Sequence, residues 1–99
     1  MDQTTAITLG KAYKELIMQH LNVEEVILYG SYGKGNPHPD SDIDIAIVVD
    51  SIKGNYFDTV PLLWKLRRQI SNLIEPILIS EEDDRSGFLE SIRKNGIVL

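Results

Sequence analysis

The segment DIDIAIVV, at residues 42–49, is the feature that most constrains the fold of this chain. Its apolar side chains alternate, with Ile43 and Ile45 on one face, and an alternation of period two predicts a β-strand. The same alternation places Asp42 and Asp44 together on the opposite face. Two adjacent carboxylates repel each other, so this pair needs a compensating cation. Hard divalent ions such as Mg²⁺ take oxygen ligands of this kind.

A turn-rich segment, GSYGKGNPHPDS at residues 30–41, precedes this strand, and its three glycines and two prolines predict a loop. The run EVILY at residues 25–29 predicts another strand, which ends where the loop begins. Gly30 and Ser31 therefore stand at a strand end. A glycine there lets the backbone approach a phosphate, a following helical turn points its N–H groups at the anion, and the Ser31 hydroxyl can donate one more hydrogen bond.

The loop does not match the common phosphate-binding motifs. Gly30 and Gly35 have the separation of a P-loop, but Asn36 and Pro37 stand where Lys and Ser or Thr are required. The chain also lacks the G-x-G-x-x-G pattern of dinucleotide-binding folds. Lys34 can add positive charge beside a phosphate, and a solvated loop lysine is the open alternative.

The other segments alternate between helical and strand patterns. Apolar side chains recur at spacings of three and four over residues 5–20, and again from a cap at Asp58 to about residue 72, which predicts two amphipathic helices. The run IEPILI at residues 74–79 predicts a third strand, and Pro76 favours a sheet edge because it cannot donate to a ladder.

The C-terminal region predicts a last helix, with a cap at Ser80 and an end at Gly96. Residues 97–99 form either a further strand or a packed tail. The expected fold class is α/β (α+β), with a small mixed three-stranded sheet flanked by helices.

Length and composition limit the functions open to this chain. Its 99 residues predict a single domain over residues 1–99, and the absence of cysteine excludes disulfides and thiolate metal sites. A net charge of −5 argues against a long nucleic acid as the main ligand, and the basic group at residues 65–68 fits a solvated helix face. With no apolar run of membrane-spanning length and no signal peptide pattern, we expect no membrane association and a cytoplasmic location.

Gly30-Ser31, then ten residues, then Asp42-x-Asp44 resembles the GS-x10-D-x-D signature of the DNA polymerase β-like nucleotidyltransferase superfamily. The fuller string LYGSYGKGNPHPDSDIDIAIVV, residues 28–49, is similar to its smallest branch, the minimal nucleotidyltransferase (MNT) proteins. The resemblance extends to the leading helix, to the strand that carries Glu75 and to the closing helix. It implies a polymerase β-like nucleotidyltransferase fold.

The resemblance also implies roles for particular residues. Asp42 and Asp44 are the expected ligands of two Mg²⁺ ions, with Mn²⁺ as the alternative, and Glu75 is the expected third ligand and activator of the acceptor hydroxyl. The family usually has Asp at that third position, so an ordinary edge-strand glutamate is the open alternative. The implied nucleotide-binding residues are Gly30, Ser31, Tyr32, Lys34 and Ser41. Tyr32 and Lys34 depart from the family, which often has Arg at both positions.

The function that the resemblance implies is transfer of a nucleoside monophosphate, AMP from ATP, to a hydroxyl group with release of pyrophosphate. MNT proteins commonly act as antitoxins that modify a tyrosine on a helical HEPN ribonuclease toxin, so a partner protein of that kind is expected. Homo-oligomers and hetero-oligomers both remain open.

Two other functions remain open at this point. The chain can be an inactive binding module that neutralises a toxin by contact, although the intact Gly-Ser and Asp-x-Asp pairs argue against a decayed site. It can also be a transferase for small molecules such as antibiotics. Enzymes of that kind typically add a helical domain for the acceptor, and this chain ends soon after the nucleotidyltransferase core.

Overall fold

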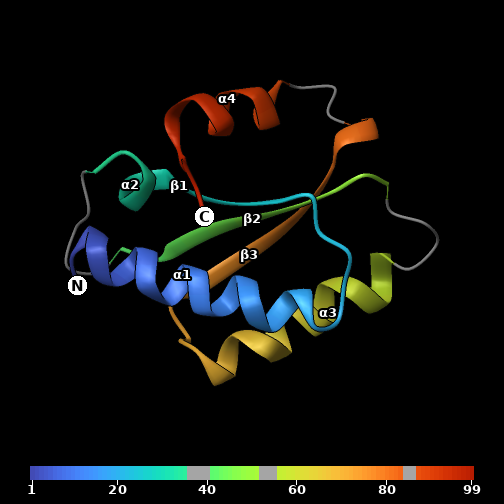
Figure 1. Cartoon of the computed structure of the whole chain (residues 1–99), viewed down its shortest axis with the longest axis horizontal. Coiled ribbons are helices and arrows are strands. Elements are labelled where there is room, and N and C mark those ends of the chain that lie inside the picture. The colour runs from blue at the N-terminus through green and yellow to red at the C-terminus, as the bar shows by residue number, and fades with distance from the viewer. Residues whose placement is uncertain (36–40, 52–55, 84–86) are drawn as a thin grey trace.

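The computed structural model of this chain describes residues 1–35, 41–51, 56–83 and 87–99. Two short 3-10 helices, labelled η1 and η2, accompany the α-helices and strands (Figure 1). The elements run in the order α1 (Gln3–Met18), β1 (Glu25–Tyr29), α2 (Gly30–Gly33), β2 (Ile43–Val49), α3 (Tyr56–Leu66), η1 (Arg67–Gln69), β3 (Ile74–Ser80), η2 (Glu81–Asp83), α4 (Phe88–Asn95) and β4 (Ile97–Val98).

The strands form one mixed sheet in the order β3-β2-β1-β4. Strand β2 pairs antiparallel with β1 and parallel with β3, and β4 pairs antiparallel with β1. The mixed sheet and the edge position of the strand with Pro76 are confirmed, whereas the expected strand number was one too low. The fourth strand, β4, lies where the sequence left a further strand and a packed tail as alternatives, because two residues are too few for an alternating pattern to decide.

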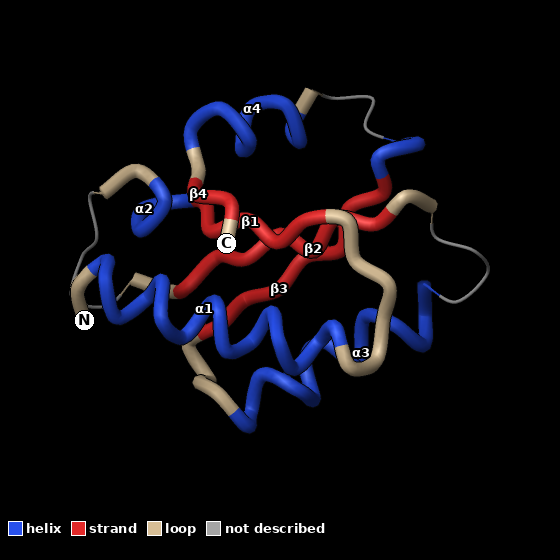
Figure 2. The backbone as a smooth tube through the Cα atoms, viewed as in Figure 1, coloured by secondary structure: helices blue, strands red, loops and turns tan. Residues whose placement is uncertain are grey.

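Helices cover both faces of the sheet, with α1 and α3 on one face and α4 on the other (Figures 1 and 2). Ile43, Ile45 and Ile47 of β2 pack into the larger apolar cluster with α1 and α3. Ala46 and Val48, which point the opposite way, pack with the apolar side of α4. Strand β2 is therefore an interior strand that is buried on both faces, and Asp44 belongs to the face that α4 covers in part.

Polar contacts fix the helices over the sheet. The Tyr13 hydroxyl donates to the Leu63 carbonyl at 2.7 Å, and this bond joins α1 to α3. Arg93 of α4 donates to Glu25 of β1 at 2.6 Å and to Glu81 of η2 at 2.7 Å. Because exposed ion pairs contribute little free energy, we assign Arg93 a role in orienting α4 rather than in overall stability.

Several predicted helix boundaries differ from the structure, including the ends, which fall at Met18 for α1 and at Leu66 for α3. Helix α1 begins at Gln3 rather than at residue 5, because the Asp2 side chain accepts the backbone N–H of Thr5 and caps the helix. Helix α3 begins at Tyr56, so Asp58 lies in its first turn and is not the N-cap residue. A carboxylate in the first turn still interacts favourably with the helix dipole.

The predicted C-terminal helix is divided. Residues 81–83 form η2, residues 84–86 lie outside the described chain, and α4 begins at Phe88 after Gly87 rather than after a cap at Ser80. The predicted end at Gly96 is confirmed, since its N–H bonds to the Ile92 carbonyl. None of the helices in the described ranges combines the length and the apolar character needed to cross a membrane.

Candidate active site

Three polar side chains stand in a row across neighbouring strands on the face that α4 covers in part. Tyr29 of β1 is directly opposite Asp44 of β2, and Asp44 is directly opposite Glu75 of β3. Adjacent strands lie about 4.8 Å apart, so side chains at paired positions are neighbours. Asp42 comes just before β2 begins and is exposed. The pairing register therefore brings Asp44 beside Glu75, and a side-chain hydrogen bond brings Asp42 beside Glu75 as well.

Gly30 connects the row to the turn that follows β1. Its φ angle is +68°, a left-handed conformation that favours glycine, and a Cβ atom added there would overlap Asp44 Oδ2. The backbone of Gly30 thus lies directly against the Asp44 carboxylate. Helix α2 starts at this point, and its N-cap residue, Tyr29, makes no side-chain capping hydrogen bond to the N–H groups of the first turn.

The row and the neighbouring Asp42 concentrate negative charge where Asp44 is half-buried and Asp42 and Glu75 are exposed. Burial and then the charge of Asp42 raise the pKa of Asp44. Burial, the charge of Asp42, a hydrogen bond with Asp42 and the charge of Asp44 raise the pKa of Glu75, while Arg67 opposes the rise. Burial and the charges of Asp44 and Glu75 raise the pKa of Tyr29 to about 12. Burial contributes most to each of these shifts, and the repulsion between the carboxylates adds to it; this repulsion is the part that a bound cation would relieve.

Glu75→Gln is expected to stabilise the metal-free protein at neutral pH. The pKa of Glu75 in the folded chain is raised, so its protonation favours folding, and that contribution is lost as the pH rises through the raised value. Glutamine carries no charge at any pH. The stability difference between the variant and the wild type should therefore grow with pH and vanish below the ordinary carboxyl pKa of about 4.

This prediction is checked by denaturant unfolding in the presence of EDTA at a series of pH values. Glu90→Gln is the matched control, because Glu90 is exposed on α4 and does not belong to the row of Tyr29, Asp44 and Glu75. A stability difference for Glu75→Gln that stays constant with pH, or that falls as pH rises, would contradict the assigned repulsion.

A preassembled metal site is not present among the described residues, where no group of three His, Cys, Asp or Glu side chains is arranged to hold an ion. Asp42, Asp44 and Glu75 share one region, but their oxygens do not converge on one point. The donor chemistry nevertheless suits a hard divalent cation, since all three candidates offer carboxylate oxygens.

The predicted nucleotide-binding residues fall into different environments. Gly30 and Ser31 open α2 beside Asp44, and Lys34 is exposed just after that helix. Ser41 is partly buried ahead of β2. The Tyr32 side chain is fully buried in the larger core cluster, so its ring cannot contact a nucleotide, and this part of the prediction is corrected. The cause is the helical turn of α2, which directs position 32 inward against α1.

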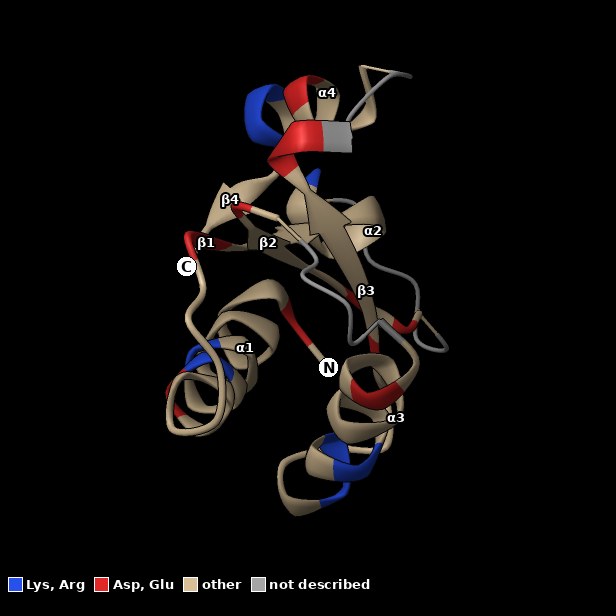
Figure 3. Ribbon diagram, turned by 90° about the vertical axis from the view of Figure 1, so that its right-hand side faces the viewer, with Lys and Arg blue, Asp and Glu red and all other residues tan. Residues whose placement is uncertain are grey.

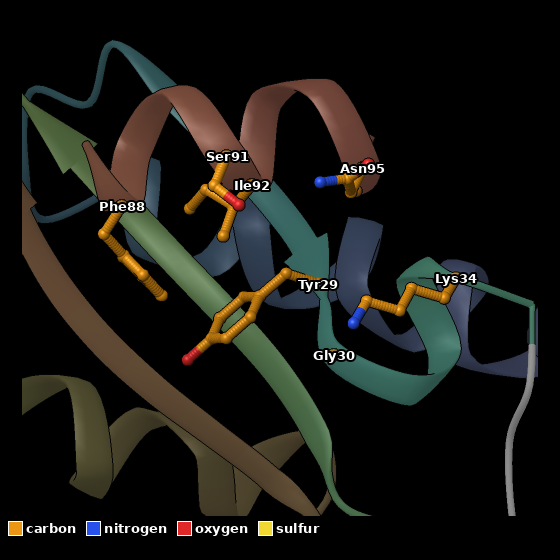
Figure 4. A pocket seen from close by; sticks show the side chains of 8 residues that line it. Tyr29, Gly30, Lys34, Phe88, Ser91, Ile92 and Asn95 are labelled. Atoms are coloured by element: carbon orange, nitrogen blue, oxygen red, sulfur yellow. The ribbon is translucent and has the colours of Figure 1, made fainter.

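A pocket of about 180 Å³ adjoins the row, between α2 and α4. Figure 4 shows its lining side chains, which come from the end of β1, from the turn after α2 and from one face of α4. The lining residues are Tyr29, Gly30, Lys34, Phe88, Ser91, Ile92, Asn95 and Gly96. Sequence reasoning missed the α4 residues of this group. Phe88, Ser91 and Asn95 share a helix face by their spacing, but nothing in the sequence indicates that this face meets α2.

The basic side chains lie mostly away from this face. Lys65 and Arg68 are exposed at the end of α3 and in η1, in the layer on the far side of the sheet from α4 (Figure 3). Arg67 instead donates to the carbonyls of Asn72 and Ile74 at 2.5 and 3.1 Å and thereby fixes the start of β3. Within the described residues, this arrangement does not build a basic track that leads to Asp42, Asp44 and Glu75.

Comparison with known proteins identifies one protein family. Its model, described as Polymerase beta, Nucleotidyltransferase, matches residues 11–99. A crystal structure of a proposed nucleotidyltransferase from Sulfolobus solfataricus has a TM-score of 0.69 and 28% sequence identity to this chain, and the match covers 97% of this chain and 80% of that one.

A second similar protein is much longer than this chain. The bifunctional uridylyltransferase/uridylyl-removing enzyme of Vibrio campbellii is 27% identical over 88 aligned residues. The match covers 74% of this chain but only 10% of the relative, so this chain spans about a tenth of that enzyme.

Proposed function

Because this chain belongs to the polymerase beta nucleotidyltransferase family, we propose that it transfers a nucleoside monophosphate from a nucleoside triphosphate to an acceptor hydroxyl. The observation that carries the proposal is the pairing of Asp44 with Glu75 across β2 and β3, with Gly30 packed against Asp44. Two carboxylates therefore lie next to a turn whose backbone can approach a phosphate closely, as a reaction at a phosphate requires.

Asp42, Asp44 and Glu75 are the proposed ligands of divalent metal ions. Support comes from their oxygen-only chemistry and from the repulsion among the three carboxylates, which adds to burial in raising the pKa of Asp44 and Glu75. The three carboxyl groups need side-chain rotations to meet at one ion, since the described residues do not preassemble such a cluster. Bound ions would neutralise charge on the triphosphate and polarise the α-phosphate.

The proposed reaction is attack of the acceptor oxygen on the α-phosphorus. A new P–O bond forms while the bond from the α-phosphorus to the oxygen that bridges the β-phosphate breaks, and pyrophosphate leaves with that electron pair. The Glu75 carboxylate accepts the hydroxyl proton.

The Gly30-Ser31 turn is the proposed site for the β- and γ-phosphates. The N-cap residue of α2 makes no side-chain capping hydrogen bond, so backbone N–H groups at its start and the Ser31 hydroxyl can donate to phosphate oxygens. Lys34 follows at the end of this turn, and its ammonium group is exposed on the same side of the site. Ser41, at the far end of the connecting loop, is the remaining proposed contact.

We further propose that the nucleotide is ATP, the metal ion is Mg²⁺ and the acceptor is a hydroxyl of a partner protein. The resemblance of residues 28–49 to MNT proteins supports a helical HEPN-type ribonuclease toxin as that partner, with this chain as its cytoplasmic antitoxin. A binding module without catalysis and a transferase for small molecules are the competing functions.

The test measures the intact mass of a co-purified helical partner after incubation with Mg²⁺ and ATP, or with UTP, GTP or CTP. We expect mass increments of one AMP with the wild type and none with the Asp42→Ala/Asp44→Ala double variant. Asp58→Ala is the matched control, because Asp58 is an exposed aspartate on α3.

The other outcomes separate the competing functions. A tight complex without any added mass would favour the binding module. Label from [α-³²P]ATP on small hydroxyl compounds, with none on a protein, would favour the small-molecule transferase. Increments of UMP alone would retain the transfer reaction and reject ATP as the nucleotide.

A further inference from the structure

The segment between α3 and β3, residues 67–73, links the two strands that carry the candidate metal ligands (Figure 1). The carbonyl of Leu73, at the end of this segment, accepts from the N–H of Ile43, the first residue of β2, at 2.8 Å. Asp42 precedes Ile43 in the chain, and Glu75 follows Leu73 by two residues. The conformation of the 67–73 segment therefore helps to set where Glu75 lies relative to Asp42.

Arg67 closes this segment with both its backbone and its side chain. Its carbonyl accepts from the N–H groups three and four residues later, at 2.9 and 2.8 Å. Its Nη1 atom donates to the carbonyls of Asn72 and Ile74, at 2.5 and 3.1 Å. The Ile74 carbonyl belongs to the peptide bond that joins Ile74 to Glu75. Arg67 thus holds the segment at four points, and the last of them is next to a candidate metal ligand.

The guanidinium group of Arg67 is itself held in place. Its Cζ atom lies 4.5 Å from the centroid of the Trp64 ring, which is a cation–π contact. Its Nε atom is buried and has no hydrogen-bond partner among the described residues. Because an unpaired buried donor is unfavourable, the orientation of the group depends on its other contacts, which are the two carbonyls and the Trp64 ring.

Arg67 differs in this respect from the basic residues next to it. Lys65 and Arg68 are exposed, as a solvated helix face requires, whereas Arg67 is half-buried. The charge of Arg67 also acts on Glu75, whose pKa it lowers against the effect of the neighbouring carboxylates. Solubility alone therefore does not account for the position of Arg67.

We propose that Arg67 is a positioning residue for the metal centre, because it fixes the segment that sets Glu75 beside Asp42 and Asp44. The inference rests on the proposed function, in which these three carboxylates hold divalent ions. Their side chains must rotate to meet at an ion, since the described residues show no preassembled cluster. A backbone that is fixed in advance reduces the ordering that metal binding must supply.

The test measures the affinity for Mn²⁺ by electron paramagnetic resonance in the presence of the α,β-methylene analogue of ATP. Arg67→Met keeps an unbranched apolar side chain and removes the donors and the charge. We expect it to bind Mn²⁺ about tenfold more weakly than the wild type, as is usual when the support of a metal ligand is lost. Arg67→Lys keeps the charge without the planar fork and should also bind more weakly. It is the deciding variant if Arg67→Met does not fold.

Two controls separate positioning from charge and from stability. Arg68→Met removes the same charge from the next residue, which is exposed, and should leave the Mn²⁺ affinity unchanged. Tyr13→Phe removes the buried hydrogen bond to the Leu63 carbonyl, outside the 67–73 segment. It should lower the stability of the fold and still leave the Mn²⁺ affinity unchanged.

Hydrogen exchange in EDTA tests the segment without a metal ion. The Ile43 amide, which donates to Leu73, should exchange faster in Arg67→Met than in the wild type, and by a larger factor than the amides of β1. Equal acceleration of all these amides would overturn the proposal, as would unchanged Mn²⁺ affinity in the folded Arg67 variants or an equal loss in either control. A wild type that binds no Mn²⁺ with the nucleotide would instead contradict the proposed function.

Discussion

Asp44→Asn is expected to lower the rate of nucleotidyl transfer by about 10³-fold or more, equivalent to about 4 kcal/mol of transition-state stabilisation. Asp44 is the middle residue of the row, with Tyr29 on one side and Glu75 on the other. An amide of the same shape keeps one oxygen but loses the negative charge that a metal ion requires. Single-turnover measurements with saturating [α-³²P]ATP report this loss directly.

The same substitution should leave the metal-free fold intact or more stable. Burial and Asp42 both raise the pKa of Asp44, so the charged form is unfavourable in the folded chain and its removal is favourable. Denaturant unfolding in EDTA measures this effect beside the kinetics. Asp58→Asn makes the same chemical change on the exposed surface of α3 and should alter neither quantity much. A large loss of stability in Asp44→Asn would assign the carboxylate to the fold instead of to catalysis.

Gly30→Ala is the second change with a large expected effect, because it acts on the backbone and on Asp44 together. The left-handed φ of +68° costs roughly 1–2 kcal/mol for a residue with a Cβ atom. That Cβ would also overlap Asp44 Oδ2 and lie 3.2 Å from its Cγ. We expect a total destabilisation of about 2–5 kcal/mol. Because the carboxylate must turn away from the row, we also expect loss of transfer activity.

Gly87→Ala separates these two causes. Gly87 has a similar φ of +73°, but a Cβ atom there would meet nothing within 4 Å. This variant should therefore show the backbone strain of roughly 1–2 kcal/mol and retain most of its activity. Chemical denaturation and transfer kinetics on both variants give the comparison. Similar activities for Gly30→Ala and Gly87→Ala would show that the contact between residue 30 and Asp44 has no catalytic importance.

The strand pattern of the sequence predicted the centre of the fold well. The alternation of Ile43 and Ile45 predicted β2 and a shared apolar face, and both are confirmed; the structure adds that this face meets α1 and α3. The resemblance of the Gly-Ser and Asp-x-Asp motifs to nucleotidyltransferases predicted the family and the fold, and both are confirmed. These predictions succeeded because both features are local, being contained in short runs of consecutive residues.

Features that depend on pairing between distant segments were harder to predict. The sequence contained the two aspartates and Glu75, but only the parallel register of β2 and β3 places Asp44 opposite Glu75. Strand β4 is defined by its pairing with β1 rather than by a pattern of its own. The pocket could not be predicted for the same reason, because the contact between α4 and the turn after β1 joins distant segments and leaves no periodic pattern in the sequence.

Tyr32 illustrates how a motif position can mislead. Its place in the Gly-Ser loop indicated a nucleotide contact, but its ring is fully buried and its hydroxyl faces the start of the chain, 3.4 Å from the Met1 carbonyl. A helical turn directs successive side chains about the axis, so residues that are adjacent in a motif point in different directions. Ser31 and Lys34 remain the candidates on the open side of this turn.

Binding of Mn²⁺, followed by electron paramagnetic resonance in the presence and absence of a non-hydrolysable nucleoside triphosphate, tests the central claim most directly, because it requires no knowledge of the acceptor. We predict that the wild type binds the metal ion and the nucleotide together, each strengthening the other, and that Asp44→Asn and Glu75→Gln lose this coupling while remaining folded. Metal binding that is equally strong in all three proteins, or nucleotide binding by the wild type that does not depend on the metal, would contradict a nucleotidyltransferase centre at Asp42, Asp44 and Glu75.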